Sequence, residues 1–414
     1  MQDVIIVGAG AAGLVAAVLL SRENINVTLL EHNDKIGRKL LATGNGKCNF
    51  TNDVQVKECY RGENPDFAWQ LIERYGKNEF LLFLNSLGIL PKNKQGYYYP
   101  YSEQAASIVD ALLTELSHQR VKIKCLEHVV NIKQDTGGFT VQTKTYAYRA
   151  NQVILACGGM AMPSLGSDGS GYALAKKLGH KVTDLQPAMT GLRVGQKGFD
   201  CLAGIRIKAE LTLSIDGKVK THEQGELQFT AYGISGIPVF QVSRYATMAL
   251  MQQKTVSVQL ALLPALTKES LVQYIGQQKK TNGYKTRLQV LQNLMDPKLA
   301  KELLKLVGLR SDGALSTTSS EEIRLLVNQI KQYTLPIKGS NGFEQAQVTA
   351  GGVDTRQLSP GTLESLICEN LYLIGELVDV DGTCGGYNLQ WAYTSAKAAT
   401  DAILQKVRHR NEEV

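Results

Sequence analysis

The residues best suited to chemistry at the start of this 414-residue chain are the glycines of Gly8-Ala9-Gly10-Ala11-Ala12-Gly13. A short β-branched run, Asp3–Val7, precedes them, and a helix-forming run, Leu14–Leu20, follows them. A second buried-strand pattern ends in the acid Glu31, 18 residues past Gly13. Strand, Gly-x-Gly-x-x-Gly, helix, strand and acid in this order predict a dinucleotide-binding βαβ unit.

Each part of this pattern has a physical role. Gly8 permits a tight turn, Gly10 lets the backbone approach a pyrophosphate, and Gly13 lets the helix lie close to the strand. The helix N-terminus faces the phosphates, and Glu31 can accept hydrogen bonds from both hydroxyls of an adenosine ribose. The acid favours FAD or NAD over NADP. The alternative is a glycine loop that only packs a helix on a sheet.

A second segment with binding chemistry runs from Gly37 to Asn52 and contains Thr43-Gly44-Asn45-Gly46-Lys47-Cys48-Asn49. Its dense glycine, asparagine and basic residues predict an irregular loop instead of a regular helix or strand. Exposed amides together with Arg38, Lys39 and Lys47 would suit a phosphate or a flavin edge. The alternative is a solvated loop without a ligand.

A third segment lies near the other end of the chain. A short buried strand, Asn370–Ile374, breaks at Gly375-Glu376, and Gly382-Thr383-Cys384-Gly385-Gly386-Tyr387-Asn388-Leu389-Gln390 follows soon after. A small-residue helix is expected from Trp391 to about Ile403. In a flavoprotein, such a helix N-terminus would stabilise negative charge on the reduced ring.

The middle of the chain must position these segments. Gln152–Gly159 predicts a buried strand that ends in small residues. The pattern from about Thr190 to Leu260 alternates like antiparallel strands, with a hairpin turn at Asp216-Gly217. Between about Lys268 and Pro336 the period becomes helical, with a capping box at Ser319 and Glu322. The remaining glycines do not form a second nucleotide-binding unit, so a nicotinamide dinucleotide would dock only transiently.

Composition excludes several classes of protein. Hydrophobic residues make up 43% of the chain and charged residues 20%, which excludes a mainly disordered chain. The net charge of +7 is a mild basic bias and does not favour nucleic-acid binding without a basic stripe. Seven scattered cysteines and isolated histidines predict no metal site and a reducing compartment. We expect a cytoplasmic protein without a membrane span or signal peptide.

Taken together, the motifs resemble the bacterial BaiN-like flavoproteins, a group that includes aminoacetone-oxidase-like enzymes. The resemblance covers nearly the whole chain, and Gly-Asn-Gly-Lys-Cys-Asn and Gly-Gly-Tyr-Asn-Leu-Gln-Trp are its most specific parts. It implies an α/β fold with a doubly wound Rossmann-like FAD domain in two sequence segments, 1–189 and 339–414. A β-rich insertion, 190–262, and a helical subdomain, 263–338, would lie between them.

The resemblance and the motifs together predict non-covalent FAD and a large set of contact residues. The expected FAD-binding residues are Gly8, Gly10, Ala11, Ala12, Gly13, Glu31, His32, Arg38, Lys39, Thr43, Gly44, Asn45, Gly46, Lys47, Cys48, Asn49, Val129, Ala156, Cys157, Gly158, Gly159, Gly375, Glu376, Asp381, Gly386, Tyr387, Asn388, Leu389 and Gln390.

The implied activity is hydride transfer between flavin N5 and a small organic substrate, with oxygen or NAD(P)H as the redox partner. Amine or aminoketone oxidation and NAD(P)H-dependent reduction of a conjugated C=C bond in an enone or steroid-like substrate both stay open. An RNA-associated flavoprotein is a further alternative. Tyr387, Arg193 and Tyr99 are candidates for an acid or base, and the catalytic residue stays unassigned. Ala231 stands where many family members carry histidine, so no histidine-based chemistry is carried over.

Overall fold

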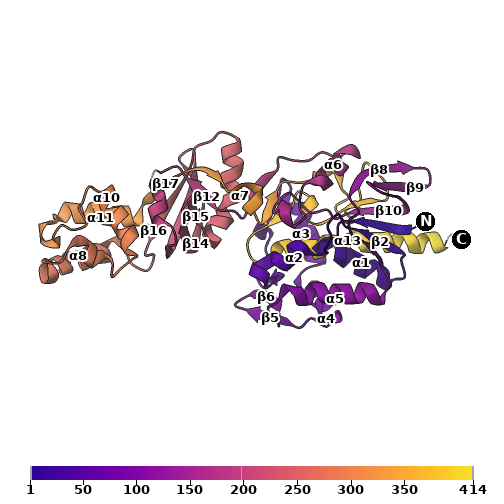
Figure 1. The fold of residues 1–414 in the computed structure, drawn as a ribbon, viewed down its shortest axis with the longest axis horizontal. Helices are drawn as coiled ribbons and strands as arrows, with labels where there is room; N and C mark the ends of the chain where they lie inside the picture. Colours follow the sequence, from indigo (N-terminus) through magenta and orange to yellow (C-terminus); the bar gives the residue numbers. More distant parts are fainter. Residues whose placement is uncertain (1, 197, 413–414) are drawn as a thin grey trace. The chain divides into compact units, whose positions relative to one another are not determined.

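The computed structural model describes residues 2–196 and 198–412, which form two compact units (Figure 1). The two-segment unit contains residues up to 186 and residues from 347 onward, and the inserted unit contains residues 187–346. Each unit has its own hydrophobic core. The predicted boundaries at 189/190 and 338/339 remain predictions. The β-rich part and the helical subdomain that were expected in the insertion both lie in this inserted unit.

The two-segment unit is built on a seven-stranded sheet. Its strand order is β7-β2-β1-β10-β9-β8, and β19 pairs with β10 as well. The strands β2, β7, β10 and β19 join β1 in a parallel arrangement, whereas β8, β9 and the first half of β10 form an antiparallel meander. The strands are β1 Gln2–Val7, β2 Val27–Leu30, β7 Lys122–Lys124, β8 Val129–Asp135, β9 Gly138–Thr143, β10 Ala147–Leu155 and β19 Leu371–Leu373.

Helices surround this sheet, and β19 and the last helix come from the second segment of the chain. Helix α1 packs against both α5 and α13 (Figure 1). The helices are α1 Ala11–Arg22, α2 Arg38–Ala42, α3 Pro65–Arg74, α4 Lys77–Ser86, α5 Ala105–His118, α6 Ser170–Lys177 and α13 Tyr387–Glu412. The predicted α/β fold with a doubly wound, Rossmann-type sheet in two segments is thereby confirmed.

Two local predictions in this unit are wrong. The segment Arg38–Ala42 was expected to be irregular, but it forms the short helix α2. Its Arg, Lys, Leu and Ala residues all favour helix, and Gly37, with φ 68°, turns the chain just before it. Helix α13, expected from Trp391 to about Ile403, begins at Tyr387 and extends to Glu412. Its longer course is set by packing against α1, which a local pattern does not report.

Short strands complete the two-segment unit, and among them β5 and β6 form a hairpin whose second strand also pairs with β3. Strands β4 and β20 pair with each other across the two segments. The bounds are β3 Thr51–Asn52, β4 Tyr60–Arg61, β5 Pro91–Lys94, β6 Tyr97–Pro100, β18 Val348–Ala350 and β20 Asp381–Gly382. Strand β11, Gln186–Ala188, begins at the last residue of the first segment and continues into the inserted unit.

The inserted unit contains a closed barrel with the strand order β12-β15-β14-β13-β16-β17. The predicted hairpin turn is confirmed, since Asp216 and Gly217, with φ 48° and 75°, join β13 to β14. The barrel strands are β12 Leu192–Val194, β13 Arg206–Ile215, β14 Lys218–Thr230, β15 Gly233–Ser235, β16 Val256–Leu262 and β17 Tyr333–Ser340.

Helices of the inserted unit were predicted only in part. The capping box of Ser319 with Glu322 is confirmed, and the stripe behind it is buried. Helix α7, by contrast, lies in the region that was expected to hold strands only, and it packs against the barrel strands β13, β14 and β17, which a local sequence pattern does not report. The helices are α7 Ile237–Met251, α8 Lys268–Asn282, α9 Arg287–Leu291, α10 Pro297–Leu306, α11 Ser320–Lys331 and α12 Gly342–Gln345. Of the helices within the described ranges, none is long and apolar enough to cross a membrane.

Candidate functional site

The candidate site lies at the carboxyl ends of four neighbouring parallel strands. Val7 of β1 lies opposite Leu30 of β2 and Leu155 of β10, and Leu155 lies opposite Leu373 of β19. The residues that follow these strands therefore meet at one sheet edge. They include Gly8, Glu31, the Ala156–Gly159 turn and Gly375-Glu376. Open parallel sheets bind nucleotides at this edge.

The glycine loop has the shape that a diphosphate requires. A Cβ on Gly8 would lie 2.5 Å from the Ala156 carbonyl oxygen, and one on Gly13 would lie 2.0 Å from the Gly8 carbonyl oxygen. A Cβ on Gly10 would have no atom within 4 Å, so its outer side is open. In the described structure, Gly10 caps α1 without a side-chain hydrogen bond. Because the N-cap is glycine, no N-cap side chain accepts from the first amides of α1, and the N-terminus of this helix suits an anion.

Glu31 ties the glycine loop to the end of β2. Its Oε2 accepts a hydrogen bond from Ala9 N at 2.8 Å, and its Oε1 accepts from Asn33 N at 2.9 Å and Asn33 Nδ2 at 2.8 Å. Glu31 is buried. Since a carboxylate accepts about four hydrogen bonds, Glu31 retains capacity for about one more donor, such as a ribose hydroxyl.

Two histidines border Glu31. The His32 ring contacts the His128 ring edge-on at a centroid distance of 5.8 Å, and Val129, the first residue of β8, follows His128. Burial lowers the pKa of His128, and the neighbouring Lys144 lowers it further. His128 is therefore neutral at pH 7. The structure brings His32 and Val129 to the Glu31 end of the site, where the adenosine of FAD was expected.

A hydrogen-bond network joins the two chain segments in the middle of the site. Lys39 Nζ donates to Glu376 Oε2 at 2.8 Å, and Thr349 N donates to Glu376 Oε1 at 2.8 Å. Thr349 Oγ1 accepts from Met160 N at 2.8 Å and from Ala161 N at 3.1 Å. A Cβ on Gly159 would lie 2.4 Å from Thr349 Oγ1, so this turn requires glycine. Thr349 was not predicted as a site residue, because threonine in a strand pattern carries no distinct signal.

Residues 43–49 form an open loop with an unusual backbone. Gly44, Asn45 and Gly46 have φ values of 56°, 55° and 81°, and residues 44–47 are exposed. The turn is closed by its own backbone, since Lys47 N donates to the Gly44 carbonyl oxygen at 3.2 Å and Cys48 N donates to the Thr43 carbonyl oxygen at 3.0 Å. Cys48 is buried, and burial raises its pKa to about 11, so its thiol is neutral and packs instead of reacting. Asn49 Nδ2 donates to the carbonyl oxygens of Thr51 and Tyr98.

A glycine turn before α13 lies against this loop region. Gly385 and Gly386 have φ values of 137° and 95°, and a Cβ on Gly386 would lie 2.6 Å from Thr51 N. Asn388 Oδ1 accepts from Gly382 N at 2.8 Å, and Gln390 Oε1 accepts from Thr51 Oγ1 at 2.6 Å. These side chains are engaged within the protein. They hold the turn before α13 to the first chain segment and to β20.

Helix α13 also frames the turn after β19. Trp391 Nε1 donates to the Gly375 carbonyl oxygen at 3.0 Å, and Gly375 N donates to Ser395 Oγ at 2.9 Å. Trp391 and Ser395 are buried and four residues apart, hence on one helix face. Neither was predicted as a site residue. The available signal in the sequence was their separation by four residues, which places both on one face of a helix. Asp381, a predicted contact, is fully buried in β20.

The three candidates for acid or base catalysis occupy different surroundings. The Tyr387 hydroxyl donates to the Val54 carbonyl oxygen at 2.9 Å, and burial raises the pKa of Tyr387. Tyr99 is half-buried on β6, and burial raises its pKa as well. Arg193 is exposed in the inserted unit, where its Nε donates to Asn341 Oδ1 at 3.2 Å. The catalytic assignment of all three remains a prediction.

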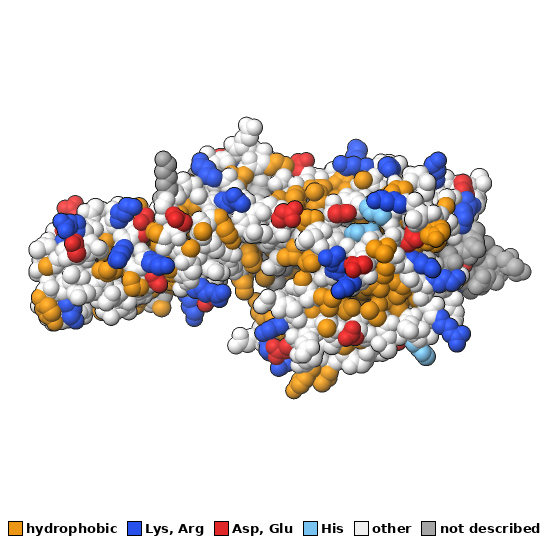
Figure 2. Space-filling model, in the orientation of Figure 1, with side chains coloured by type: hydrophobic (Ala, Val, Ile, Leu, Met, Phe, Trp, Pro, Cys, Tyr) orange, Lys and Arg blue, Asp and Glu red, His pale blue; other side chains and the backbone are white. Residues whose placement is uncertain are grey.

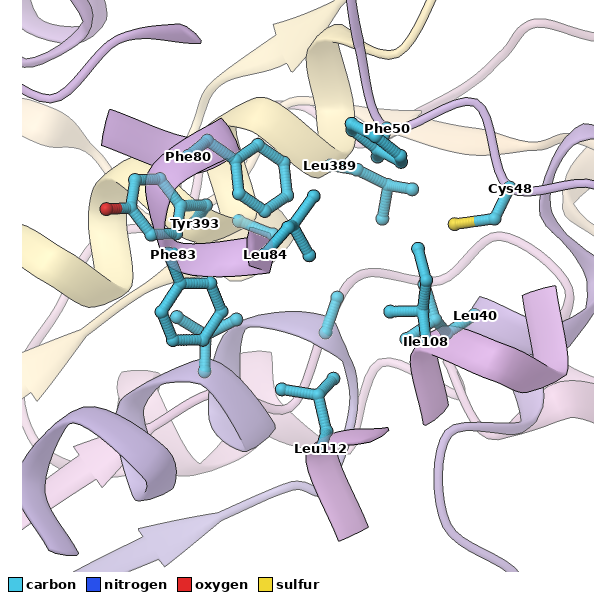
Figure 3. Close-up of a pocket in the computed structure, with 13 residues that line it drawn as sticks. Leu40, Cys48, Phe50, Phe80, Phe83, Leu84, Ile108, Leu112, Leu389 and Tyr393 are labelled. Atoms are coloured by element: carbon cyan, nitrogen blue, oxygen red, sulfur yellow. The ribbon is translucent and has the colours of Figure 1, made fainter. Parts of the chain in front are cut away.

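A small apolar cavity of about 20 Å³ lies behind the loop and α13 (Figure 3). Its wall includes Cys48, Phe80, Leu112, Leu389 and Tyr393. In Figure 3, the Cys48 sulfur points into the hollow and the Tyr393 hydroxyl points away from it. The cavity has room for about one water-sized molecule, far less than a ligand pocket needs. It is therefore not the substrate pocket.

The surface of the two-segment unit combines apolar and charged areas. Figure 2 shows an apolar area on this face, with histidine side chains beside it and Lys, Arg, Asp and Glu side chains around it. Within the described ranges, no three His, Cys, Asp or Glu side chains are grouped so that they could hold a metal ion. The geometry thus offers a nucleotide site and no metal centre among the described residues.

Comparisons with known proteins agree with this geometry. Residues 2–402 match the family described as HI0933-like protein Rossmann domain. The chain is 41% identical to the 3-dehydro-bile acid delta(4,6)-reductase of Clostridium scindens, over 98% of this chain and 100% of that protein. It is 33% identical to the ribosomal RNA dihydrouridine synthase of Haemophilus influenzae, over 97% and 98% of the two chains.

Solved structures show the same fold. The 3-ketosteroid delta1-dehydrogenase from Sterolibacterium denitrificans, in complex with 1,4-androstadiene-3,17-dione, matches with a TM-score of 0.51 and 13% identity, over 98% of this chain and 99% of that chain. The family match over nearly the whole chain confirms the resemblance inferred from the motifs. The chain belongs to the HI0933-like Rossmann-domain family and is an FAD-dependent oxidoreductase.

Proposed function

We propose that this protein reduces a C=C bond conjugated to a carbonyl group in a small ring substrate, with NAD(P)H as the hydride source. The observation that carries the proposal is the whole-length similarity to a protein named as a delta(4,6)-reductase of a 3-dehydro-bile acid. The dihydrouridine synthase is also named for a product with one double bond fewer. Of the two reactions left open by the sequence, reduction is therefore favoured over amine oxidation with oxygen.

The site supports this proposal through its electrostatics. FAD, when bound, supplies hydride chemistry at its ring. The α1 amides would hold its diphosphate, and Glu31 would bind its ribose. The first amides of α13, a helix of 26 residues that follows the Gly385-Gly386 turn, would lie at the ring end of the site. Their partial positive charge would stabilise electron density on the reduced ring.

The net reaction is balanced. One hydride from NAD(P)H and one proton from solvent or an acid side chain add across the C=C bond, which yields the saturated product and NAD(P)⁺. We propose no covalent attachment of FAD. The buried, neutral Cys48 thiol is unsuited to such a bond.

RNA is the second candidate substrate, and one observation favours it. The inserted unit has 20 Lys and Arg against 12 Asp and Glu, a net charge of +8. The two-segment unit has 25 against 26, a net charge of −1. The whole positive excess therefore belongs to the insertion. A polyanion such as ribosomal RNA, the substrate in the names of two relatives, would bind there with a strong salt dependence.

An anaerobic experiment tests the proposal. Purified holoprotein is mixed with NADPH, and flavin absorbance is followed; a cyclic enone or a 3-oxo-4-ene steroid is then added. Bleaching by NADPH and recovery of the oxidised spectrum with the enone are expected. In a parallel aerobic assay, peroxide production from an amine, together with no bleaching by NADPH in the anaerobic assay, would instead identify an oxidase. Reoxidation by a uridine-containing RNA and not by any small enone would support the second candidate.

A further inference from the structure

We propose that NADPH docks on one face of the β5–β6 hairpin, beside the ring end of the FAD site, an inference that rests on the proposed reductase function. The hairpin pairs Lys92 with Tyr99 and Lys94 with Tyr97. Residues directly opposite in an antiparallel pair project to the same side of the sheet. These four residues therefore form one surface, the hairpin face.

The hairpin face has an excess of positive charge. Lys92 Nζ lies 2.7 Å from Glu103 Oε1, and Lys94 Nζ lies 2.5 Å from Glu103 Oε2. Lys47 Nζ, from the open loop, lies 3.9 Å from Glu103 Oε2. The lysines lower the pKa of Glu103 to about 2, so the carboxylate is charged at neutral pH. Three ammonium groups around one carboxylate leave a local charge of +2, which complements an anion.

Aromatic rings lie among these charges. The Tyr97 side chain is 40% exposed, and Tyr101, next to the hairpin, is 62% exposed. Lys94 Nζ lies 6.0 Å from the Tyr99 ring centroid, and Lys92 Nζ lies 5.4 Å from the Tyr101 ring centroid. Exposed rings next to lysines are the groups that bind a flat base joined to phosphates.

The hairpin face borders the proposed flavin ring site on two sides. A Cβ on Gly385, in the glycine turn before α13, would lie 3.4 Å from Tyr97 Cε1. Lys47 belongs to the 43–49 loop, which is predicted to contact the flavin. A dinucleotide held by these lysines would thus lie next to the ring that it must reduce. This placement explains how hydride could be delivered without a second nucleotide-binding domain.

The opposite face of the hairpin serves as an internal control. There, Asp53 accepts hydrogen bonds from Lys77 Nζ at 2.8 Å, Asn93 Nδ2 at 2.8 Å and Tyr98 Oη at 2.9 Å. This cluster has one carboxylate for one ammonium group, so its net charge is zero. The two faces therefore share a hairpin and differ in charge. Substitutions on them separate binding from hairpin stability.

The test measures NADPH binding and flavin reduction separately in the holoprotein. Anaerobic stopped-flow traces at increasing NADPH give a dissociation constant and a limiting reduction rate, and NADP⁺ titration gives binding without reduction. In the double variant Lys92→Ala/Lys94→Ala, the NADPH dissociation constant should rise about 10-fold or more at low salt. The limiting rate should stay within about twofold, because the lysines bind and do not react.

A variant with the opposite sign makes the test sharper. Glu103→Gln raises the local charge from +2 to +3, so NADPH should bind about two- to fivefold more tightly. A purely structural role for Glu103 predicts unchanged or weaker binding. Lys77→Ala, on the neutral face, should leave the dissociation constant unchanged. FAD content and melting temperature report whether each variant is folded.

The outcomes distinguish this inference from the proposed function. If NADPH reduces the wild-type flavin but neither hairpin-face variant changes the dissociation constant, docking at the hairpin is overturned and the reductase function stands. Weakening by Lys77→Ala equal to that of the double variant would also overturn it. If NADP⁺ binds with the predicted charge dependence but NADPH does not reduce the flavin, the proposed function fails and the docking site stands.

Discussion

Replacing Glu31 tests the nucleotide site most directly. In Glu31→Ala, the amides of Ala9 and Asn33 lose their acceptor, and the ribose of FAD loses a charged partner. Glu31→Gln keeps one acceptor oxygen in place of the carboxylate and adds a donor that the Ala9 amide cannot accept. The alanine variant should therefore be the weaker binder of FAD, with the glutamine variant between it and the wild type.

The magnitude follows from the hydrogen bonds. A hydrogen bond to a charged group contributes about 1.5–3 kcal/mol. Loss of the ribose contact should thus weaken FAD binding about 10- to 150-fold. Loss of the contact from Ala9 N, at 2.8 Å, adds to this because it frees the glycine loop that presents the α1 amides. Glu31→Ala should lie toward the upper end of that range.

The assay is the quenching of FAD fluorescence as apoprotein is titrated. Glu127→Gln is the matched control, because Glu127 is also a buried acid beside Glu31. Its backbone amide donates to the Glu31 carbonyl oxygen at 2.9 Å, and its carboxylate accepts from Thr145 Oγ1. This control should bind FAD like the wild type. An unchanged FAD dissociation constant in a folded Glu31→Ala variant would refute the hypothesis that Glu31 binds the ribose of FAD.

Four further predictions follow from the same geometry. Acid precipitation should leave yellow cofactor in the supernatant, because FAD is expected without a covalent link; a yellow pellet would contradict this. Gly386→Ala should reduce FAD retention, since its Cβ would lie 2.6 Å from Thr51 N at φ 95°, whereas Gly361→Ala, in open space, should be neutral. Burial raises the Cys48 pKa from about 9 to about 11. The contribution of Cys48 to the free energy of unfolding should therefore be fully present below pH 9 and fall by up to about 2–3 kcal/mol as the pH rises to 11. Urea titrations of Cys48→Ala should lack this pH-dependent loss. A chain that ends at Leu335 lacks β19 and α13 and should be insoluble or free of flavin by absorbance; a soluble fragment with native FAD affinity would contradict the two-segment site.

Local patterns were sufficient for the elements whose structure depends on nearby residues. The Asp216-Gly217 hairpin and the Ser319 capping box depend on residues a few positions apart, and the β1–α1–β2 unit lies within residues 2–30. Helix α7 lies in a region predicted to form strands, and β17 begins in a region predicted to be helical. Both elements depend on contacts with residues far away in the sequence. Helix α7 forms because it packs against β13, β14 and β17, and β17 closes the barrel by pairing with β12. Such contacts between distant residues leave little trace in a short window of sequence.

The candidate site divides in the same way. Glycines and acids such as Gly10 and Glu31 are recognisable because their residue type itself carries the chemistry. Thr349, Trp391 and Ser395 are common residue types that act by holding a neighbouring backbone turn. Their role exists only once two distant segments are folded together. A sequence motif therefore identifies the groups that would contact FAD better than the groups that position them.

The positioning groups explain why one site can be divided between two segments. Lys39 and Glu376 are 337 residues apart, yet their side chains lie 2.8 Å apart at the sheet edge. Trp391 and Ser395 fix the turn at Gly375, and a Cβ on Gly375 would lie only 2.9 Å from Ala12 Cβ at the start of α1. Because the first segment would supply the diphosphate amides and the second holds the turn at Gly375 against the start of α1, we expect that neither segment forms the site alone.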